Sequence, residues 1–318
     1  MNTFIASPGF DASRFQGTTL ILPSVSIGNV PQLTTDLLLA ALKLDRVGCI
    51  EDENVVPVLG PADRPLETSV TSTSASSTPS LSSGLSLAVE VFQSKDGKWT
   101  LIQQRSPTVA HRSGHYVENL VQFIKDSQFD QVVLLASADG ARRTDNQLRS
   151  GHPVRFIGSP ALNPELRSLI EHQLQILPLE RIPATEEEAL REQQPTSVLS
   201  ERVLSERVQD IQLEQTPSSS TTTPKNLLEP VPRIPSGGIA RRLHALCQQS
   251  EISILTLVAF AMEGDNAEDA IFLANVLNAV LKVYTPTEEQ VQRGEGGWKV
   301  PKSWDSLYGN SYPQDMYQ

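Results

Sequence analysis

Polar side chains that could carry out chemistry stand in turns that follow apolar runs. Ser24 and Ser26 follow the apolar run 18–22, and Asp265 follows the apolar run 252–262. A serine in such a turn can act as a nucleophile, and a carboxylate can act as a general base. The G-x-S-x-G pattern of α/β hydrolases is absent, however, and the sequence places no histidine to activate either serine. The serine turn is therefore expected to be structural.

Two other groups of residues could bind an anion. The turn 24–29 joins an apolar run to a helical pattern, and helix N-termini bind phosphate through free N–H groups. It lacks both the G-x-G-x-x-G pattern and the lysine of a P-loop. Arg142 and Arg143 lie between Asp139 and Asp145, after a central apolar run. This cluster could bind an anion at the carboxyl edge of a sheet, or it could close on itself in salt bridges.

Histidine and cysteine show no metal or redox pattern. His111 and His115 are four residues apart, but the residues between them are poor helix formers and no carboxylate completes a zinc set. Cys49 and Cys247 form no C-x-x-C motif and stand in apolar or helical patterns. We expect buried free thiols, with a disulfide as the alternative. No metal and no cofactor is predicted.

The net charge and the lengths of the apolar runs indicate which classes of protein the chain can belong to. The 318 residues carry a formal net charge of −11, whereas a nucleic-acid-binding face would be basic. The sequence opens with no signal peptide, and no apolar run approaches the roughly 20 residues of a membrane span. A cytosolic or nuclear soluble protein with no nucleic-acid partner and no membrane association is therefore expected.

The apolar runs and the helical patterns alternate along the chain, which predicts an α/β fold with a largely parallel sheet. The run 131–137 is apolar throughout and so belongs at the sheet centre. An Asp-Gly turn between 87–93 and 99–104 predicts a hairpin. The remaining predicted strands are 18–22, 47–50, 55–59, 154–157 and 252–262, of which 252–262 could also be a buried helix, although its β-branched start favours a strand. The predicted helices begin near Asn29–Pro31, Tyr116, Asn163, Ile239 and Asp265 or Asn266.

Low-complexity stretches interrupt this pattern. Residues 67–86 are rich in serine and threonine, and 183–230 contain glutamate, glutamine, proline and a tandem repeat, so both are predicted to be disordered insertions. The chain then divides into one domain, 1–283, and an extended C-terminal tail, 284–318. The tail has spaced aromatic residues, which predicts a segment that orders on a partner; the alternative is that its tryptophans pack on the core.

Four short motifs lie in and around the polar turns. They are LILPSVSIGNVPQLTTDLL in the first unit, DNQLRS at 145–150, RIPSGGIARRL at 233–243 and EGDNAEDA at 263–270. Together, and in this order, they resemble the proteasome assembly chaperone 2 family, while the two insertions are unmatched. The resemblance implies a three-layer α/β/α fold and a non-enzymatic chaperone. It also implies a heterodimer with proteasome assembly chaperone 1 that binds the outer face of the 20S α-subunit ring.

The resemblance to this family implies a docking function for the last three residues. Met316, Tyr317 and Gln318 fit the hydrophobic–Tyr–any pattern with which proteasome activators dock between α subunits. A terminal carboxylate can pair with a lysine, an interaction whose loss costs about 2–5 kcal/mol, and a tyrosine anchor adds about 2 kcal/mol. The partner's tail is the alternative docking element.

Two other classes of function stay open from the sequence alone. One is an enzyme of the hydrolase or nucleoside-processing type, with a site at the strand ends formed by Ser24, Asn29, Arg142, Asp145 and Asp265. The other is a scaffold whose insertions bind partners.

Overall fold

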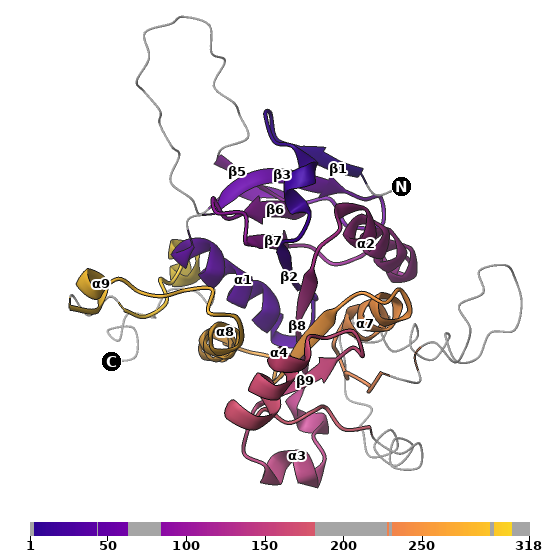
Figure 1. Ribbon diagram of the computed structural model, residues 1–318, viewed down its shortest axis with the longest axis vertical. Coiled ribbons are helices and arrows are strands. Elements are labelled where there is room, and N and C mark those ends of the chain that lie inside the picture. Colours follow the sequence, from indigo (N-terminus) through magenta and orange to yellow (C-terminus); the bar gives the residue numbers. More distant parts are fainter. Residues whose placement is uncertain are drawn as a thin grey trace, which may run out of the picture.

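The computed structural model describes residues 3–42, 44–62, 84–181, 228, 231–292 and 296–306. Its centre is an eight-stranded sheet in the order β1-β3-β6-β7-β2-β8-β10-β9, with helices on both faces (Figure 1). The strands are β1 (Thr3–Ala6), β2 (Thr19–Pro23), β3 (Asp45–Glu51), β6 (Val89–Gln93), β7 (Trp99–Gln104), β8 (Gln131–Asp139), β9 (Val154–Gly158) and β10 (Ile254–Ala261). A small second sheet pairs β4 (Leu59–Pro61) with β5 (Leu85–Leu87).

The described helices form the outer layers and the short connections. The longer ones are α1 (Val30–Ala41), α2 (Ser113–Ser127), α7 (Ala240–Gln249) and α8 (Ala267–Leu281). The short ones are α3 (Asp145–Arg149), α4 (Pro164–Ser168), α9 (Glu288–Gln292), the 3-10 turns η1 (Ala12–Phe15), η2 (Ile27–Asn29), η4 (Gly140–Arg142) and η7 (Lys302–Ser306), and the π-helical turn η5 (Leu169–Gln173).

Helices cover the sheet in pairs, so the predicted three-layer α/β/α arrangement is confirmed. Helices α1 and α8 pack together on one face, and α2 and α7 pack together on the other (Figure 1). Leu37 and Leu277 belong to the core on the α1 face, while Leu120 and Leu243 belong to the core on the α2 face. Each amphipathic helix buries its apolar stripe, which is the main source of its stability.

Parallel pairing is confined to the sheet centre. Strands β7, β2, β8 and β10 run parallel, whereas the pairs β1–β3, β3–β6, β6–β7 and β10–β9 are antiparallel. The sheet is therefore mixed: the predicted hairpin β6–β7 begins an antiparallel section at one end, and β9 pairs antiparallel with β10 at the other. Strands β8 and β10 are buried along nearly their whole length, as their continuous apolar sequences predict.

Several local predictions need correction. The helix predicted to begin near Asn29–Pro31 has Asn29 as its N-cap residue, but Asn29 has a left-handed backbone with φ of 52° and its side chain makes no capping hydrogen bond. The predicted strand 55–59 is displaced to β4. The predicted insertion 67–86 ends earlier than expected, since Leu85 and Ser86 lie in β5, where the Ser86 hydroxyl donates to the buried Glu90 carboxylate. Residues 67–83 of this predicted insertion lie outside the described residues.

The other two low-complexity segments are described only in part. Within 183–230 the structure describes Leu228, whose carbonyl oxygen accepts from Arg241 and whose side chain packs on the core. Of the predicted tail, 284–292 and 296–306 are described. There the rings of Tyr284 and Trp298 lie 5.1 Å apart, and Trp298 Nε1 donates to Asn275 Oδ1. Trp298 and Trp304 pack against the α1-face core, which is the alternative raised for the tryptophans.

Candidate functional site

The polar turns predicted as candidate sites gather at one edge of the sheet. Strands β2, β8 and β10 are parallel neighbours, so the segments that follow them, 24–29, 140–150 and 262–266, leave the sheet at the same edge. This carboxyl edge is where α/β proteins usually bind ligands. The segment 233–238 also reaches it, since the Asp139 N–H donates to the Pro235 carbonyl oxygen at 2.9 Å.

The two serines act as ties between segments. Ser24 is fully buried, and its hydroxyl donates to the Gly237 carbonyl oxygen at 2.8 Å. Ser26 Oγ lies 2.8 Å from Ser137 Oγ and accepts the Ser137 N–H at 3.0 Å. A nucleophilic serine gives its hydrogen to a base, whereas the Ser24 hydrogen is held by a backbone carbonyl. These hydroxyls hold the edge together.

Two glycines allow the motifs to approach closely. A Cβ atom on Gly238, which has φ of +60°, would lie 2.0 Å from the Val25 carbonyl oxygen. A Cβ atom on Gly28, which has φ of +69°, would lie 2.7 Å from Asn266 Nδ2. Because only glycine fits both the backbone conformation and the space, the first, third and fourth motifs are packed directly against one another.

The arginines of this edge are engaged within their own segment. Arg142 Nε lies 3.5 Å from Asp139 Oδ2, and Arg143 Nε donates to the Gly140 carbonyl oxygen at 3.2 Å. The Arg143 guanidinium also lies over the Phe260 ring, 5.4 Å from its centre. Of the salt bridges that the sequence left open for this cluster, the structure shows the Arg142–Asp139 pair, while Arg143 contacts a carbonyl oxygen and an aromatic ring.

The second motif is fixed by a buried arginine. Thr144 and Gln147 form a capping box at the start of α3. Arg155, on β9, is 1% exposed and donates to the carbonyl oxygens of His152 at 2.6 Å and of Gln147 at 3.2 Å. Burial lowers the pKa of Arg155 because it disfavours the charged form, and the carbonyl oxygens that accept from the guanidinium oppose this effect. This role could not be predicted from the sequence, because an arginine within a short strand is usually exposed.

The last of the predicted polar groups caps α8. Helix α8 begins as predicted near these residues: Asp265 Oδ1 accepts the N–H of its first residue, Ala267, at 3.0 Å, and the N-cap residue Asn266 donates from Nδ2 to the Gly264 carbonyl oxygen at 2.9 Å. Ser24, Asn29, Arg142, Asp145 and Asp265 thus lie on turns at one edge. Ser24, Arg142 and Asp265 are held by their own surroundings, and this arrangement does not assemble a nucleophile with its base.

The other candidate residues are the histidines and the cysteines. In the described ranges, no three histidine, cysteine or acidic residues lie close enough to hold a metal ion. His115 Nδ1 lies 3.7 Å from Glu118 Oε2, and His111 has a left-handed backbone. Cys49 and Cys247 are free, as predicted, but only Cys247 is buried, since Cys49 is partly exposed. Burial raises the pKa of the Cys247 thiol to about 12. No described helix has the length and apolar character needed to span a bilayer.

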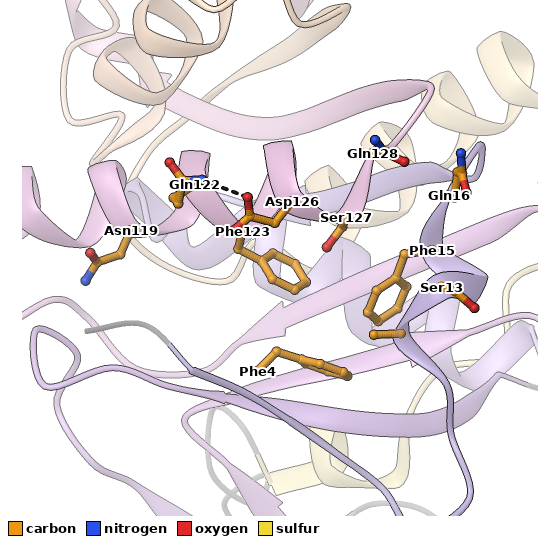
Figure 2. Close-up of a pocket in the computed structure, with 11 residues that line it drawn as sticks. Phe4, Ser13, Phe15, Gln16, Asn119, Gln122, Phe123, Asp126, Ser127 and Gln128 are labelled. Carbon is orange, nitrogen blue, oxygen red and sulfur yellow. Dashed lines mark hydrogen bonds between the residues drawn. The ribbon is translucent and has the colours of Figure 1, made fainter.

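An open groove lies away from this edge, at the outer strand of the sheet. It has a volume of about 580 Å³ and is bounded by β1, η1 and α2. Figure 2 shows its aromatic floor, in which Phe4 from β1 and Phe123 from α2 meet Phe15. The ring centres of Phe4 and Phe15 are 5.1 Å apart, and those of Phe4 and Phe123 are 5.8 Å apart. No pattern in the sequence indicated this groove.

The predicted docking motif Met316, Tyr317 and Gln318 lies outside the described residues.

Comparison with known proteins places the chain among relatives. Residues 20–295 match the PAC2 family. Over 315 residues, 99% of this chain and 100% of the relative, it is 32% identical to a protein of Danio rerio named proteasome assembly chaperone 2. It is 26% identical to the human protein of that name over 97% of this chain and 98% of the relative. The Pyrococcus furiosus protein PbaA, described as an archaeal homolog of proteasome-assembly chaperone, shares the fold with a TM-score of 0.52 and 11% identity, over 93% of this chain and 92% of PbaA.

Proposed function

Because this chain belongs to the PAC2 family, we propose that it is a proteasome assembly chaperone and not an enzyme. The observation that carries the proposal is its similarity, over nearly the full length, to proteins named proteasome assembly chaperone 2. The geometry of the carboxyl edge supports the same function, because residues that an enzyme would use for catalysis are used there as structural ties.

The proposal extends to partners. Proteasome assembly chaperone 1 is the proposed heterodimer partner, and the outer face of the 20S α-subunit ring is the proposed target, in the cytoplasm and the nucleus. The formal charge of −11 supports protein rather than nucleic-acid partners. Met316, Tyr317 and Gln318 are the proposed ring-docking residues: a tyrosine anchor and a carboxylate–lysine pair together contribute about 4–7 kcal/mol, much of the roughly 8 kcal/mol of a micromolar interaction.

Co-expression with the chaperone 1 relative and the α subunits of the same organism tests the proposal. We expect a complex of the two chaperones to purify and to capture α subunits. The reasoning fails if the chain purifies alone and captures neither protein. A parallel assay of the Ser24→Ala variant addresses the enzyme alternative, since the tie to Gly237 predicts reduced stability and unchanged complex formation once folded.

Deletion of 316–318 tests the docking residues. Binding to the α ring should weaken while the pairing with chaperone 1 is retained, because the tripeptide is proposed to contact only the ring. Replacing Gln318 with alanine is the matched control, since the pattern accepts any residue there. Equal ring affinity for the full and shortened chains would exclude the tripeptide as the anchor.

A further inference from the structure

The outer edge of β1 has unused main-chain hydrogen-bonding groups. The Ser7 N–H donates to the Val47 carbonyl oxygen at 2.8 Å, and Ile5 pairs with Cys49 in the register of β1 and β3. Hydrogen-bonded pairs alternate along an antiparallel ladder, so the N–H and C=O groups of Phe4 and Ala6 point away from β3. The structure assigns them no partner within the described ranges, and β1 is the last strand of the sheet on this side.

The groove beside this edge has the chemistry of a peptide site. Phe4 and Phe123 are half-buried, so part of each ring faces the groove and gives it an apolar floor. Helix α2 forms the facing wall, where the exposed Asp126 accepts from Gln122 Nε2 at 2.8 Å (Figure 2). The volume of about 580 Å³ lies within the range of roughly 300–1,000 Å³ found for ligand sites. A strand edge, an apolar floor and a helical wall are the parts of a site that binds an extended chain by strand addition.

The charge of the groove indicates what kind of segment fits. Of the described residues that line the groove, Asp126 alone is charged. An incoming strand would place alternate side chains toward the groove, so an apolar residue on the phenylalanine floor and a cation near Asp126 would stand two positions apart. A second copy of the chain is a poor occupant, because each copy carries a formal charge of −11 and like charges repel.

We propose that the groove between β1 and α2 binds an extended segment of a partner polypeptide, added as a strand to β1. The segment carries an apolar side chain, best an aromatic one, two residues from a lysine or arginine. The apolar side chain lies on Phe4 and Phe123, the cation pairs with Asp126, and the main chain pairs with Phe4 and Ala6. This site does not depend on the function proposed above or on the C-terminal tripeptide.

Fluorescence anisotropy with the full chain tests this site. The probe is a labelled peptide with blocked ends, Thr-Val-Thr-Phe-Val-Arg-Thr, and a matched peptide has glutamate in place of arginine. We expect saturable binding of the arginine peptide, at least tenfold tighter than that of the glutamate peptide. No binding of the arginine peptide at millimolar concentration would overturn the proposal.

Two variants locate the binding. Ala6→Pro removes a donor from the outer edge and leaves the hydrogen bonds to β3 in place, since proline is tolerated on an edge strand where its missing N–H faces outward. It should weaken peptide binding at least tenfold with an unchanged circular dichroism spectrum. Asp126→Asn should remove the preference for arginine over glutamate, while the matched variant Asp130→Asn, an exposed carboxylate outside the groove, should keep it.

Three outcomes count against the site. Equal binding by wild type and Ala6→Pro would exclude strand addition at β1. A preference for arginine that persists in Asp126→Asn would exclude the proposed cation contact. Sedimentation that shows a wild-type dimer and a monomeric Ala6→Pro variant would identify a second copy as the occupant and overturn the assignment to a partner polypeptide.

Discussion

His244 makes the stability of this chain depend on pH. The imidazole, on α7, is fully buried, and its Nδ1 lies 2.8 Å from the Thr256 hydroxyl of β10. Its other nitrogen, Nε2, is buried with no hydrogen-bond partner among the described residues. Because a buried cation has lost its hydration, burial lowers the pKa of His244 from its usual 6.5 to about 4.

The sign and size of the effect follow from this shift. A group whose pKa is lower in the folded state binds its proton more weakly there, so low pH favours unfolding. The contribution is fully present above pH 6.5 and is lost as the pH falls toward 4, at about 1.4 kcal/mol per pH unit. At pH 5 the loss is about 2 kcal/mol, and the full loss below pH 4 is about 3 kcal/mol.

Urea unfolding at pH 8, 7, 6 and 5 measures this loss for the wild type and for His244→Asn. Asparagine can hydrogen-bond to Thr256 but does not titrate, so the two pH profiles should diverge by about 2 kcal/mol between pH 8 and pH 5. His115→Asn, at an exposed position, is the control and should follow the wild type. Parallel profiles for the wild type and His244→Asn would refute the reasoning.

Three further predictions follow from named contacts. Gly238→Ala should destabilise by about 3 kcal/mol or more in urea unfolding, because its Cβ would lie 2.0 Å from a carbonyl oxygen; Gly97→Ala, with a similar φ but open space around it, should cost only about 1 kcal/mol. Cys247, with its thiol pKa raised to about 12, should react with iodoacetamide only after unfolding, as mass spectrometry would show. Trp298→Ala should speed hydrogen exchange in the segment around it, because the contact with Tyr284 is lost; unchanged exchange would contradict this packing.

The sequence predicts the centre of the fold well and its edges poorly. The run 131–137 must be covered on both faces, so β8 could be predicted as a central strand, and the Asp-Gly turn was sufficient to predict the β6–β7 hairpin. Strand β1 was not predicted from the sequence. It has only four residues, and its apolar side chains Phe4 and Ile5 are adjacent, one half-buried and one exposed, so the sequence shows no clear alternation of apolar and polar residues. Its pairing with β3 depends on Gly48, where a Cβ would lie 2.6 Å from the Phe4 ring.

The ties at the carboxyl edge could not be predicted for a different reason. The hydrogen bond from Ser24 to Gly237 joins residues that are 213 positions apart, and Ser26 contacts Ser137 across 111 positions. Local propensity and periodicity contain no information on such contacts. The motifs could be picked out as unusual polar turns, but only the fold shows that they are unusual because they contact one another.

The carboxyl edge of the sheet and its outer strand β1 therefore differ in how far they are closed by contacts within the chain. At the carboxyl edge, where an α/β enzyme would leave room for a ligand, buried hydroxyls and a glycine without space for a Cβ close the segments onto each other. At β1, an outer strand leaves main-chain groups beside an open aromatic groove. Natural sheets usually protect such an edge because it pairs readily with other chains. A closed ligand edge and an open strand edge are the arrangement expected if this chain binds polypeptides, as the proposed assembly chaperone would.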